Sequence, residues 1–248
     1  VTPEKGQRLC DLDPRRVAAL FRYAGAVLFR GFPAEPTDFE ALTEKFSTVF
    51  LQDSGATRRP VEGLKEGTRR VVSPHPTHPF GLHAELATST DRLPRIIWLF
   101  CVVPPAERGQ TVLCDGQRLY RSLSAQTRQV FGPGVKVQHS RRPPVPVLRK
   151  APWAAAPAFA NALVGRPSYQ AICRFARWPG GEQLPEAPWQ EARDAAVQQT
   201  VAIDWQVGDT LMIDNSRCMH GRRPFPQDDP RTLYSRVAWD YRRELWAC

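Results

Sequence analysis

Residues 208–225 of the chain read Gly-Asp-Thr-Leu-Met-Ile-Asp-Asn-Ser-Arg-Cys-Met-His-Gly-Arg-Arg-Pro-Phe. The segment opens with a Gly-Asp turn and continues through an apolar run that is typical of a buried strand. It then reaches His220, and Arg231-Thr-Leu follows a few residues downstream. A turn, a strand, a histidine and a downstream arginine in this order make His220 a candidate metal ligand.

A second histidine pattern lies upstream, at Leu82-His-Ala-Glu-Leu86. In an extended segment residues i and i+2 project from the same face, so His83 and Glu85 can reach one metal ion. His220, 137 residues further on, supplies a third ligand. Two imidazoles and one carboxylate form the facial triad of non-haem Fe(II) oxygenases, which leaves coordination positions open. An isolated His-x-Glu is a weak signal, and the alternative for His83 is an ordinary loop or core histidine; the 208–225 segment is what favours the metal site.

Helical and strand-like patterns alternate along the rest of the chain. A helix is expected after Asp13, which can cap Pro14 at the first helical position, and another after Thr37, which forms a capping box with Glu40. Further helices are expected at residues 119–131 and 189–199. Strands are expected at residues 26–30, 96–103, 111–115, 201–205, 210–214 and 233–239.

Short strands separated by long loops, with helices before and between them, predict a mainly β fold with helices: a jelly-roll core with flanking helices. The sequence shows no internal repeat and no dividing linker, so we expect one domain over residues 1–248. Residues 52–81 are polar and rich in Arg, Gly and Pro, which predicts a mobile loop. The proline-rich residues 140–190 predict a lid insertion that folds over the active site.

Composition limits the range of partners. The net charge of +9 favours anionic partners, either through a functional basic face or as arginine spread over a solvated surface. No run of five like charges indicates a nucleic-acid tail, so nucleic acid is not an expected partner. No segment predicts a membrane span. Six cysteines without a Cys-x-x-Cys pair are typical of reduced thiols in a cytoplasmic protein.

Through several motifs that follow one another in the same order, the chain resembles the clavaminate-synthase-like, TauD/TfdA superfamily of Fe(II)/2-oxoglutarate-dependent oxygenases. The resemblance spans most of the chain, and residues 214–222 are its most specific part. It implies a double-stranded β-helix (cupin-like) core, with iron bound by His83, Glu85 and His220. The matching segments are residues 25–32, His83-Ala-Glu85, Gly109-Gln-Thr111 with Asp115, Gly208-Asp209 and residues 214–222.

The resemblance also implies an arginine beyond the second histidine that binds 2-oxoglutarate. A guanidinium pairs with a carboxylate bidentately and stays protonated, which suits this role. Arg231, in an Arg-x-Leu context, is the first candidate. Arg236 is the competitor, because the family often carries a second arginine four residues later, although the interval here is five. Thr111 matches the family position whose hydroxyl contacts the same carboxylate; alternatively, it is a β-branched residue that fills a strand.

The activity implied is hydroxylation or desaturation of a small metabolite with Fe(II), 2-oxoglutarate and O2. We expect a free or carrier-tethered amino acid or a related natural-product intermediate, and an acidic carrier protein would suit the basic surface. Glu85 fills the position that halogenating relatives leave to chloride, which disfavours halogenation. Three alternatives stay open: a sulfonate or aryloxy dioxygenase, a jelly roll that has lost catalysis and binds an anionic partner, and a zinc hydrolase with the same ligands.

Other polar and aromatic residues are weaker candidates. An arginine directed at the iron, such as Arg236 or Arg174, would favour the sulfonate alternative. The remaining candidates are His75 and His78 at the substrate mouth, Tyr169, Trp178 and Trp153 with Arg174 in a lid, Asn215 as a substrate contact or a turn residue, and Arg222 and Arg223 as site or surface charge.

Overall fold

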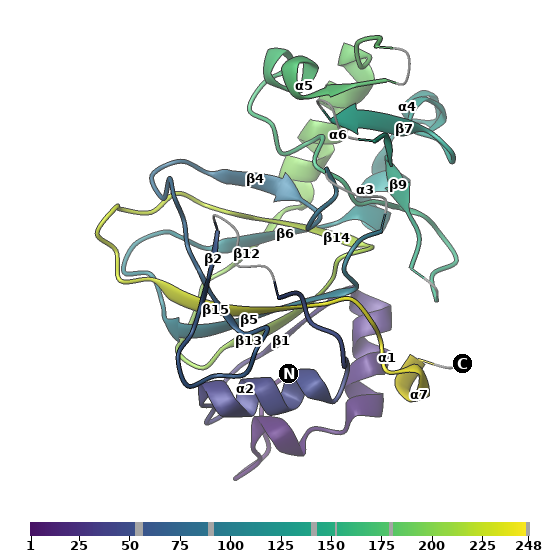
Figure 1. Ribbon diagram of the computed structural model, residues 1–248. Helices are drawn as coiled ribbons and strands as arrows, with labels where there is room; N and C mark the ends of the chain where they lie inside the picture. The colour runs from purple at the N-terminus through teal and green to yellow at the C-terminus, as the bar shows by residue number, and fades with distance from the viewer. Residues whose placement is uncertain (53–56, 89–91, 140–142, 152, 179–180, 247–248) are drawn as a thin grey trace.

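The computed structural model describes residues 1–52, 57–88, 92–139, 143–151, 153–178 and 181–246. Two antiparallel sheets form its centre (Figure 1). The larger sheet has six strands in the order β1 (Ala26–Phe29), β13 (Thr210–Asp214), β5 (Ile96–Val103), β15 (Thr232–Ala238), β3 (Arg69–Val71) and β2 (Arg58–Pro60). The smaller sheet has four strands in the order β12 (Val201–Ile203), β6 (Thr111–Asp115), β14 (Cys218–Arg222) and β4 (Phe80–His83).

Strand β5 shows how the apolar runs build both faces of the larger sheet. Side chains alternate across a strand, so Trp98 and Phe100 pack on the outer face whereas Ile97 and Leu99 point between the two sheets. Both faces of β5 are covered, which is why its sequence is apolar without interruption. The inward-facing residues of β5, β13 and β15 form the core that lies between the sheets.

Helices cover the outer face of the larger sheet. Helix α1 (Pro14–Ala24) and helix α2 (Pro36–Glu44) lie beneath it in Figure 1, and Phe21 and Phe39 are fully buried there with Trp98. Two shorter helical elements lie on the same side of the molecule: the 3-10 turn η1 (Leu9–Asp11) and α7 (Arg243–Trp246). The side chain of Asp13 accepts a hydrogen bond from the backbone N–H of Arg15, which confirms the predicted cap of α1.

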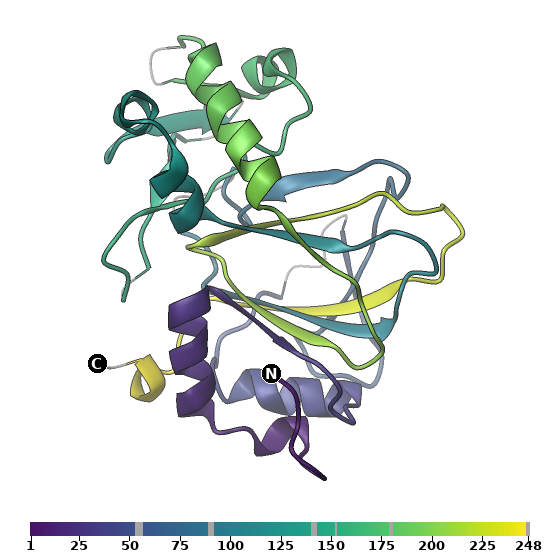
Figure 2. The same ribbon diagram turned by 180° about the vertical axis from the view of Figure 1, so that it is seen from behind.

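A second helical layer covers the smaller sheet (Figure 2). It contains α3 (Gly116–Ser122), α4 (Ala125–Val130), α5 (Tyr169–Phe175) and α6 (Glu186–Gln199), packed around a buried cluster that includes Phe159 and Trp189. Two small sheets accompany these helices: β11 (Ala176–Arg177), β7 (Lys136–His139) and β8 (Val145–Pro146) form one, and β10 (Ala158–Phe159) with β9 (Leu148–Arg149) forms the other. None of the helices among the described residues has the length and apolar character to cross a membrane.

The two facing antiparallel sheets with helices on their outer sides confirm the predicted mainly β jelly roll with flanking helices. Three local predictions were wrong. Helix α2 begins two residues earlier than expected, and its capping box joins Glu35 to Asp38 rather than Thr37 to Glu40. The expected helix at residues 119–131 is two helices, because Leu123 is extended and Ser124 caps a new helix. Residues 52–81 include the strands β2 and β3, which extend the larger sheet, rather than a loop throughout.

Candidate metal centre

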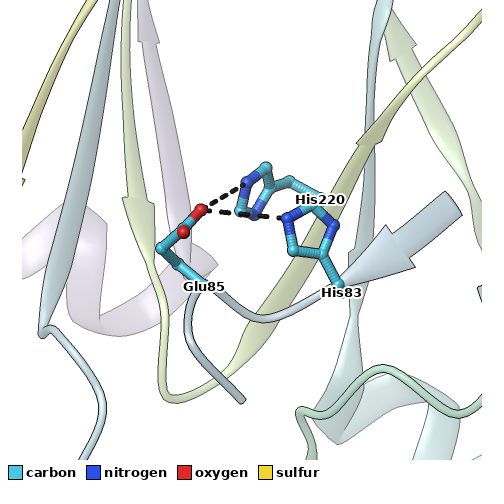
Figure 3. A group of neighbouring side chains, drawn as sticks. All are labelled: His83, Glu85 and His220. Atoms are coloured by element: carbon cyan, nitrogen blue, oxygen red, sulfur yellow. Dashed lines mark ion pairs between the residues drawn. The ribbon is translucent and has the colours of Figure 1, made fainter. Parts of the chain in front are cut away.

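Three side chains from two segments converge between the sheets (Figure 3). His83 and His220 are directly opposite each other in the pairing of β4 with β14. Oε2 of Glu85 lies 3.8 Å from Nε2 of His83 and 3.7 Å from Nε2 of His220. One potential ligand atom from each residue lies within 4.8 Å of the other two, and all three side chains are largely buried. The sequence prediction that these residues come together agrees with this geometry.

Glu85 reaches the site by a different route from the one expected. Strand β4 ends at His83, and Glu85 lies in a turn that continues through Leu86, whose φ of 61° is left-handed. The backbone of Glu85 is held by the carboxamide of Asn215, which accepts a hydrogen bond from the Glu85 N–H (2.7 Å) and donates one to its carbonyl (3.1 Å). Asn215 therefore fixes the turn in place of a continued β ladder.

Asn215 is fully buried, and its carboxamide also donates to the carbonyl of Pro94 at 3.0 Å. It lies between β13 and β14, five residues before His220, so one connection both holds the Glu85 turn and leads into the strand that carries His220. The sequence offered a turn residue or a substrate contact as roles for Asn215. It does lie in the turn between β13 and β14, and its hydrogen bonds also make it a support of the metal centre, like the outer contacts that orient metal ligands.

The nitrogen atoms of His83 have distinct surroundings. Its Nδ1 lies 3.0 Å from the carbonyl oxygen of Gly81, and this oxygen can only accept a hydrogen bond, which Nδ1–H would donate. This contact favours the tautomer in which Nε2 carries a free lone pair directed at Glu85 and His220. The Nδ1 atom of His220 is buried and has no hydrogen-bond partner among the described residues.

The electrostatic surroundings favour the protonation states that a metal requires. Burial lowers the pKa of His220 to about 3, so its imidazole is neutral at pH 7. Burial alone would raise the pKa of Glu85, but its contact with His83 and the charge of Arg58 outweigh this effect and hold that pKa well below its usual value. A neutral imidazole and a carboxylate are the forms that bind metal.

A cavity of about 750 Å³ opens at the three side chains. Its walls are largely apolar, with Ile97 and Leu99 from β5 and Leu233 and Val237 from β15. The volume falls in the range of small-molecule sites, about 300–1,000 Å³. Polar and charged side chains, including the three candidate ligands, Thr111 and Arg231, also line the cavity, and such a mixture of apolar walls and polar groups is typical of a ligand site.

Arg231 and Thr111 line the same cavity as the three candidate ligands. Nε of Arg231 donates to the carbonyl of Gly109 at 3.0 Å, and burial lowers the pKa of Arg231 to about 10, so its guanidinium stays charged at pH 7. The buried Thr111 hydroxyl accepts a hydrogen bond from Nε1 of Trp205 at 3.1 Å. Both predicted 2-oxoglutarate residues therefore line the same cavity as the candidate metal ligands.

Arg236 is not brought to the site, which contradicts the prediction that it binds 2-oxoglutarate. Leu233, Ser235 and Val237 of β15 line the cavity, and because side chains alternate along a strand, Arg236 points to the opposite face. Its Nη1 donates to the hydroxyl of Thr43 at 2.8 Å and pairs with Glu44 at 3.3 Å. Arg236 therefore joins helix α2 to the larger sheet.

The weaker candidates divide into two groups. His75, His78 and Arg222 line the outer part of the cavity, where Arg222 donates to the carbonyls of Pro76, His75 and His78. No described residue of 140–190 lines the cavity, so the expected lid has no support there.

The aromatic candidates of this segment lie away from the cavity. Tyr169 and Trp178 pack in the cluster around α6, and Trp153 packs against Phe21 and Tyr241. Arg174 is exposed on α5, and Arg223 is exposed beyond β14.

Sequence reasoning missed Arg58. This residue begins β2, lines the cavity, and places Nη2 2.9 Å from Oε1 of Glu85. It lies in the arginine-rich segment 52–81, where neither spacing nor periodicity distinguishes one arginine from the next. Only the pairing of β2 with β3, which extends the sheet beside the cavity, shows that Arg58 belongs to the site.

The donor set fits a divalent first-row metal ion. Two imidazole nitrogens and one carboxylate oxygen are the facial triad of Fe(II) oxygenases. Metal–ligand bonds of about 2 Å would draw these atoms slightly closer together than they lie here. The cavity lies against the triad, which leaves space for further ligands at the open coordination positions. A facial triad inside a jelly roll, with a buried arginine in the same cavity, is the arrangement expected of a non-haem iron oxygenase that uses a 2-oxo acid.

Comparison with known proteins agrees with this class. Over residues 2–238 the chain matches the family described as "Taurine catabolism dioxygenase TauD, TfdA family", and it belongs to that family. The family description names dioxygenases, and a solved structure with this fold, PvcB, is described as an Fe, alpha-ketoglutarate dependent oxygenase. The match covers both histidine motifs, so the resemblance read from the sequence is confirmed.

Two curated relatives are proteins of specialised metabolism. The chain is 34% identical over 65 residues to the dapdiamide synthesis protein DdaC of Enterobacter agglomerans, which covers 26% of this chain and 20% of that protein. It is 26% identical over 159 residues to the 3-((Z)-2-isocyanoethenyl)-1H-indole synthase of Fischerella ambigua, which covers 58% of this chain and 57% of that protein. These matches span about a fifth and just over half of the relatives' lengths.

Solved structures show the same fold. PvcB from Pseudomonas aeruginosa superimposes with a TM-score of 0.72 at 18% identity and covers 96% of this chain and 84% of its own. A taurine dioxygenase from Burkholderia xenovorans gives a TM-score of 0.71 at 22% identity, with 94% and 83% covered. At these identities the likeness establishes the jelly-roll fold and leaves the substrate to be argued from the site.

Proposed function

We propose that this chain binds Fe(II) through His83, Glu85 and His220 and hydroxylates or desaturates a small metabolite with 2-oxoglutarate and O2. The observation that carries the proposal is the convergence of these three side chains at the wall of a partly apolar cavity. When bound, Fe(II) supplies the oxidising chemistry, which is coupled to decarboxylation of 2-oxoglutarate to succinate. The protein supplies binding, orientation and exclusion of water.

Arg231 and Thr111 are the proposed anchors of 2-oxoglutarate. A dicarboxylate that enters an apolar cavity needs a partner for its distal charge, and Arg231 is charged, buried and lines that cavity. Thr111 keeps a hydroxyl oxygen at the same wall, oriented by its hydrogen bond from Trp205. Because Nε of Arg231 is committed to Gly109, its two terminal nitrogens form the edge that remains for a carboxylate.

The proposed substrate is a free or carrier-tethered amino acid or a related natural-product intermediate. Two relatives support this choice by their printed descriptions, one a dapdiamide synthesis protein and the other an isocyanoethenyl-indole synthase. PvcB, which shares the fold, is described as an oxygenase of an isonitrile synthetic pathway. The sulfonate alternative calls for an arginine beside the metal. Arg236 and Arg174 do not line the cavity, and Arg58 is the arginine that lies there.

The test is an anaerobic titration with Fe(II) and 2-oxoglutarate. Chelation of a 2-oxo acid at an Fe(II) facial triad predicts a visible metal-to-ligand charge-transfer band that appears only when both are present. Amino acids and related metabolites are then screened in air for stimulated succinate release. A wild-type protein that gives no band with both components at saturation would contradict the proposal.

A further inference from the structure

One positively charged side chain of the cavity wall, that of Arg58, has no role in the proposed 2-oxoglutarate site. Arg58 lines the cavity with a side chain that is only 15% exposed, and its Nη2 contacts Oε1 of Glu85 at 2.9 Å. The other oxygen, Oε2, is the one that faces His83 and His220. Glu85 can therefore bind a metal through Oε2 while Oε1 keeps its contact with Arg58, so metal binding and the ion pair are compatible.

The Arg58 guanidinium has capacity for a second anion. A guanidinium carries five N–H donors in a planar fork, and Glu85 engages one terminal nitrogen. No other ion-pair partner of Arg58 lies within the ranges of the chain that the structure describes. Its side chain borders the same space as the metal ligands, so an oxyanion in the cavity can approach the free edge of the fork.

The other two arginines of the cavity, Arg222 and Arg231, already have hydrogen-bond partners in the protein backbone. Arg222 donates through Nη1 and Nη2 to backbone carbonyls, including that of Pro76, and lies 4.8 Å from the centre of the Phe225 ring. Arg231 donates to Gly109 and carries the proposed 2-oxoglutarate anchor. Arg58 contacts Glu85, whereas Arg231 lies beside Gly109 and Phe225, so the two cationic groups serve different parts of the cavity.

The charge around the cavity favours an anionic occupant. Its described lining has three arginines and one carboxylate, that of Glu85. Fe(II) would add two positive charges, and 2-oxoglutarate would remove the same number. An excess of positive charge therefore remains in a site with apolar walls, where an unpaired charge is costly. A neutral or cationic substrate would leave that excess, whereas an oxyanion at Arg58 would reduce it.

We infer that Arg58 forms a substrate subsite, binding an oxyanionic head group of a small molecule whose apolar body lies along Ile97, Leu99 and Val237. The inference rests on the proposed function, because it assigns the substrate class of the same site. The substrate is then a carboxylate or sulfonate with an apolar part. Its head group is held beside the ligand Glu85, which keeps the neighbouring C–H bonds close to the metal.

The experiment compares wild type with Arg58→Gln, Arg58→Lys and Arg59→Gln. Arg59 is the matched control, because it is the next residue of β2 and exposed, and its substitution removes the same charge. Each protein is first loaded anaerobically with Fe(II) and 2-oxoglutarate and checked for the charge-transfer band. The probes are then L-amino acids and N-acyl amino acids, their carboxamides as neutral controls, and their sulfonate analogues. The readouts are the perturbation of the band and the consumption of 2-oxoglutarate in air.

We expect wild type and Arg59→Gln to respond to oxyanionic probes and not to the matching carboxamides. Arg58→Gln should form the band but bind the same probes at least about 30-fold more weakly, as when one partner of a buried charge pair is removed. Arg58→Lys should recover part of this binding. The carboxylate and sulfonate arms show which oxyanion is preferred.

Three results would overturn the inference. In the first, Arg58→Gln responds to oxyanionic probes as wild type does. In the second, wild type responds to carboxamides as well as to oxyanions, or to no oxyanion at all. In the third, Arg58→Gln fails to form the band at saturating Fe(II) and 2-oxoglutarate. The last result would limit Arg58 to holding Glu85. Absence of the band in wild type is a different outcome, because it contradicts the proposed function itself.

Discussion

At the scale of single residues, Glu85 has two different oxygens. Oε2 faces both histidines and Oε1 faces Arg58, so the carboxylate is poised to bind a metal through one oxygen. Its backbone is clamped by Asn215, which limits how far the turn can move. A site of this kind depends on the identity of each donor rather than on net charge.

Glu85→Ala should therefore abolish turnover and weaken Fe(II) binding by more than about 100-fold, since even outer-sphere substitutions cost about 10–100-fold. Glu107→Ala removes the same charge at an exposed position and serves as the control. Both affinities are measured by anaerobic metal titration. Wild-type affinity and full turnover in Glu85→Ala would rule out Glu85 as a ligand.

Substitution of the two candidate arginines, Arg231 and Arg236, should have different effects. Arg231→Gln should weaken 2-oxoglutarate binding at least about 30-fold without changing Fe(II) affinity, because it removes a charge partner of the distal carboxylate. Arg236→Gln should leave 2-oxoglutarate affinity unchanged and lower the free energy of unfolding by about 1–3 kcal/mol, because it removes the buried contacts of the guanidinium with Thr43 and Glu44. Band titration and urea denaturation separate the two effects. A larger loss of 2-oxoglutarate affinity in Arg236→Gln would reverse the assignment.

At the scale of elements, the sequence predicted the strands with long apolar runs and the histidine that follows one of them. β5 and β13 were found because both of their faces are covered and their residues are uniformly apolar. β14 was not recognised as a strand of its own, because polar His220 and Arg222 interrupt its pattern. The turn at Glu85 could not be foreseen either, since it depends on Asn215, 130 residues away.

The position of Arg236, the competing candidate for the 2-oxoglutarate anchor, has a simple physical origin. Arg231 lies just before β15 and Arg236 within it, and the odd interval of five residues places the two side chains on opposite faces. The same alternation puts Ser235 and Val237 at the cavity and Arg236 against helix α2. The lid at 140–190 stays a prediction without support among the described residues, because a proline-rich pattern does not distinguish a lid from a layer that packs on the outside of a sheet.

Asn215 links the Glu85 turn to the connection that leads into β14, so removal of its side chain should disturb the positions of the metal ligands. Asn215→Ala should weaken Fe(II) binding by about 10–100-fold. Asn161→Ala is the matched control, because Asn161 is equally buried and its side chain also bonds backbone groups, those of Val147 and Leu163. Both variants should lose stability, but only Asn215→Ala should lose metal affinity. Equal metal affinities in the two variants would contradict this role.

At the scale of the whole molecule, the metal centre lies between two sheets, each with its own helical cover (Figures 1 and 2). The ligands come from β4, the turn after it, and β14, so the smaller sheet carries the metal while β5 and β15 of the larger sheet supply much of the cavity wall. The net charge of +9 includes an excess of arginine in the cavity, which favours a small anionic ligand. An acidic carrier protein remains a proposal.

Because a metal bound by both β4 and β14 stabilises only the folded state, divalent metal should raise the melting temperature of the protein. At a free metal concentration of about 100 times the dissociation constant the gain is about 2.7 kcal/mol. Chelation should reverse the rise, and His220→Ala should lose it, which differential scanning fluorimetry can follow. An equal metal-dependent rise in His220→Ala would show that the stabilising ion binds elsewhere.

The central claim is that His83, Glu85 and His220 share one metal ion. Anomalous diffraction at the iron absorption edge, from crystals grown anaerobically with Fe(II) and 2-oxoglutarate, tests it most directly. We predict a single strong anomalous peak bonded to Nε2 of His83, Oε2 of Glu85 and an imidazole nitrogen of His220, with 2-oxoglutarate at the open positions and its distal carboxylate on Arg231. An iron peak outside this triad, or a fully loaded crystal with no iron between the two histidines, would contradict the account.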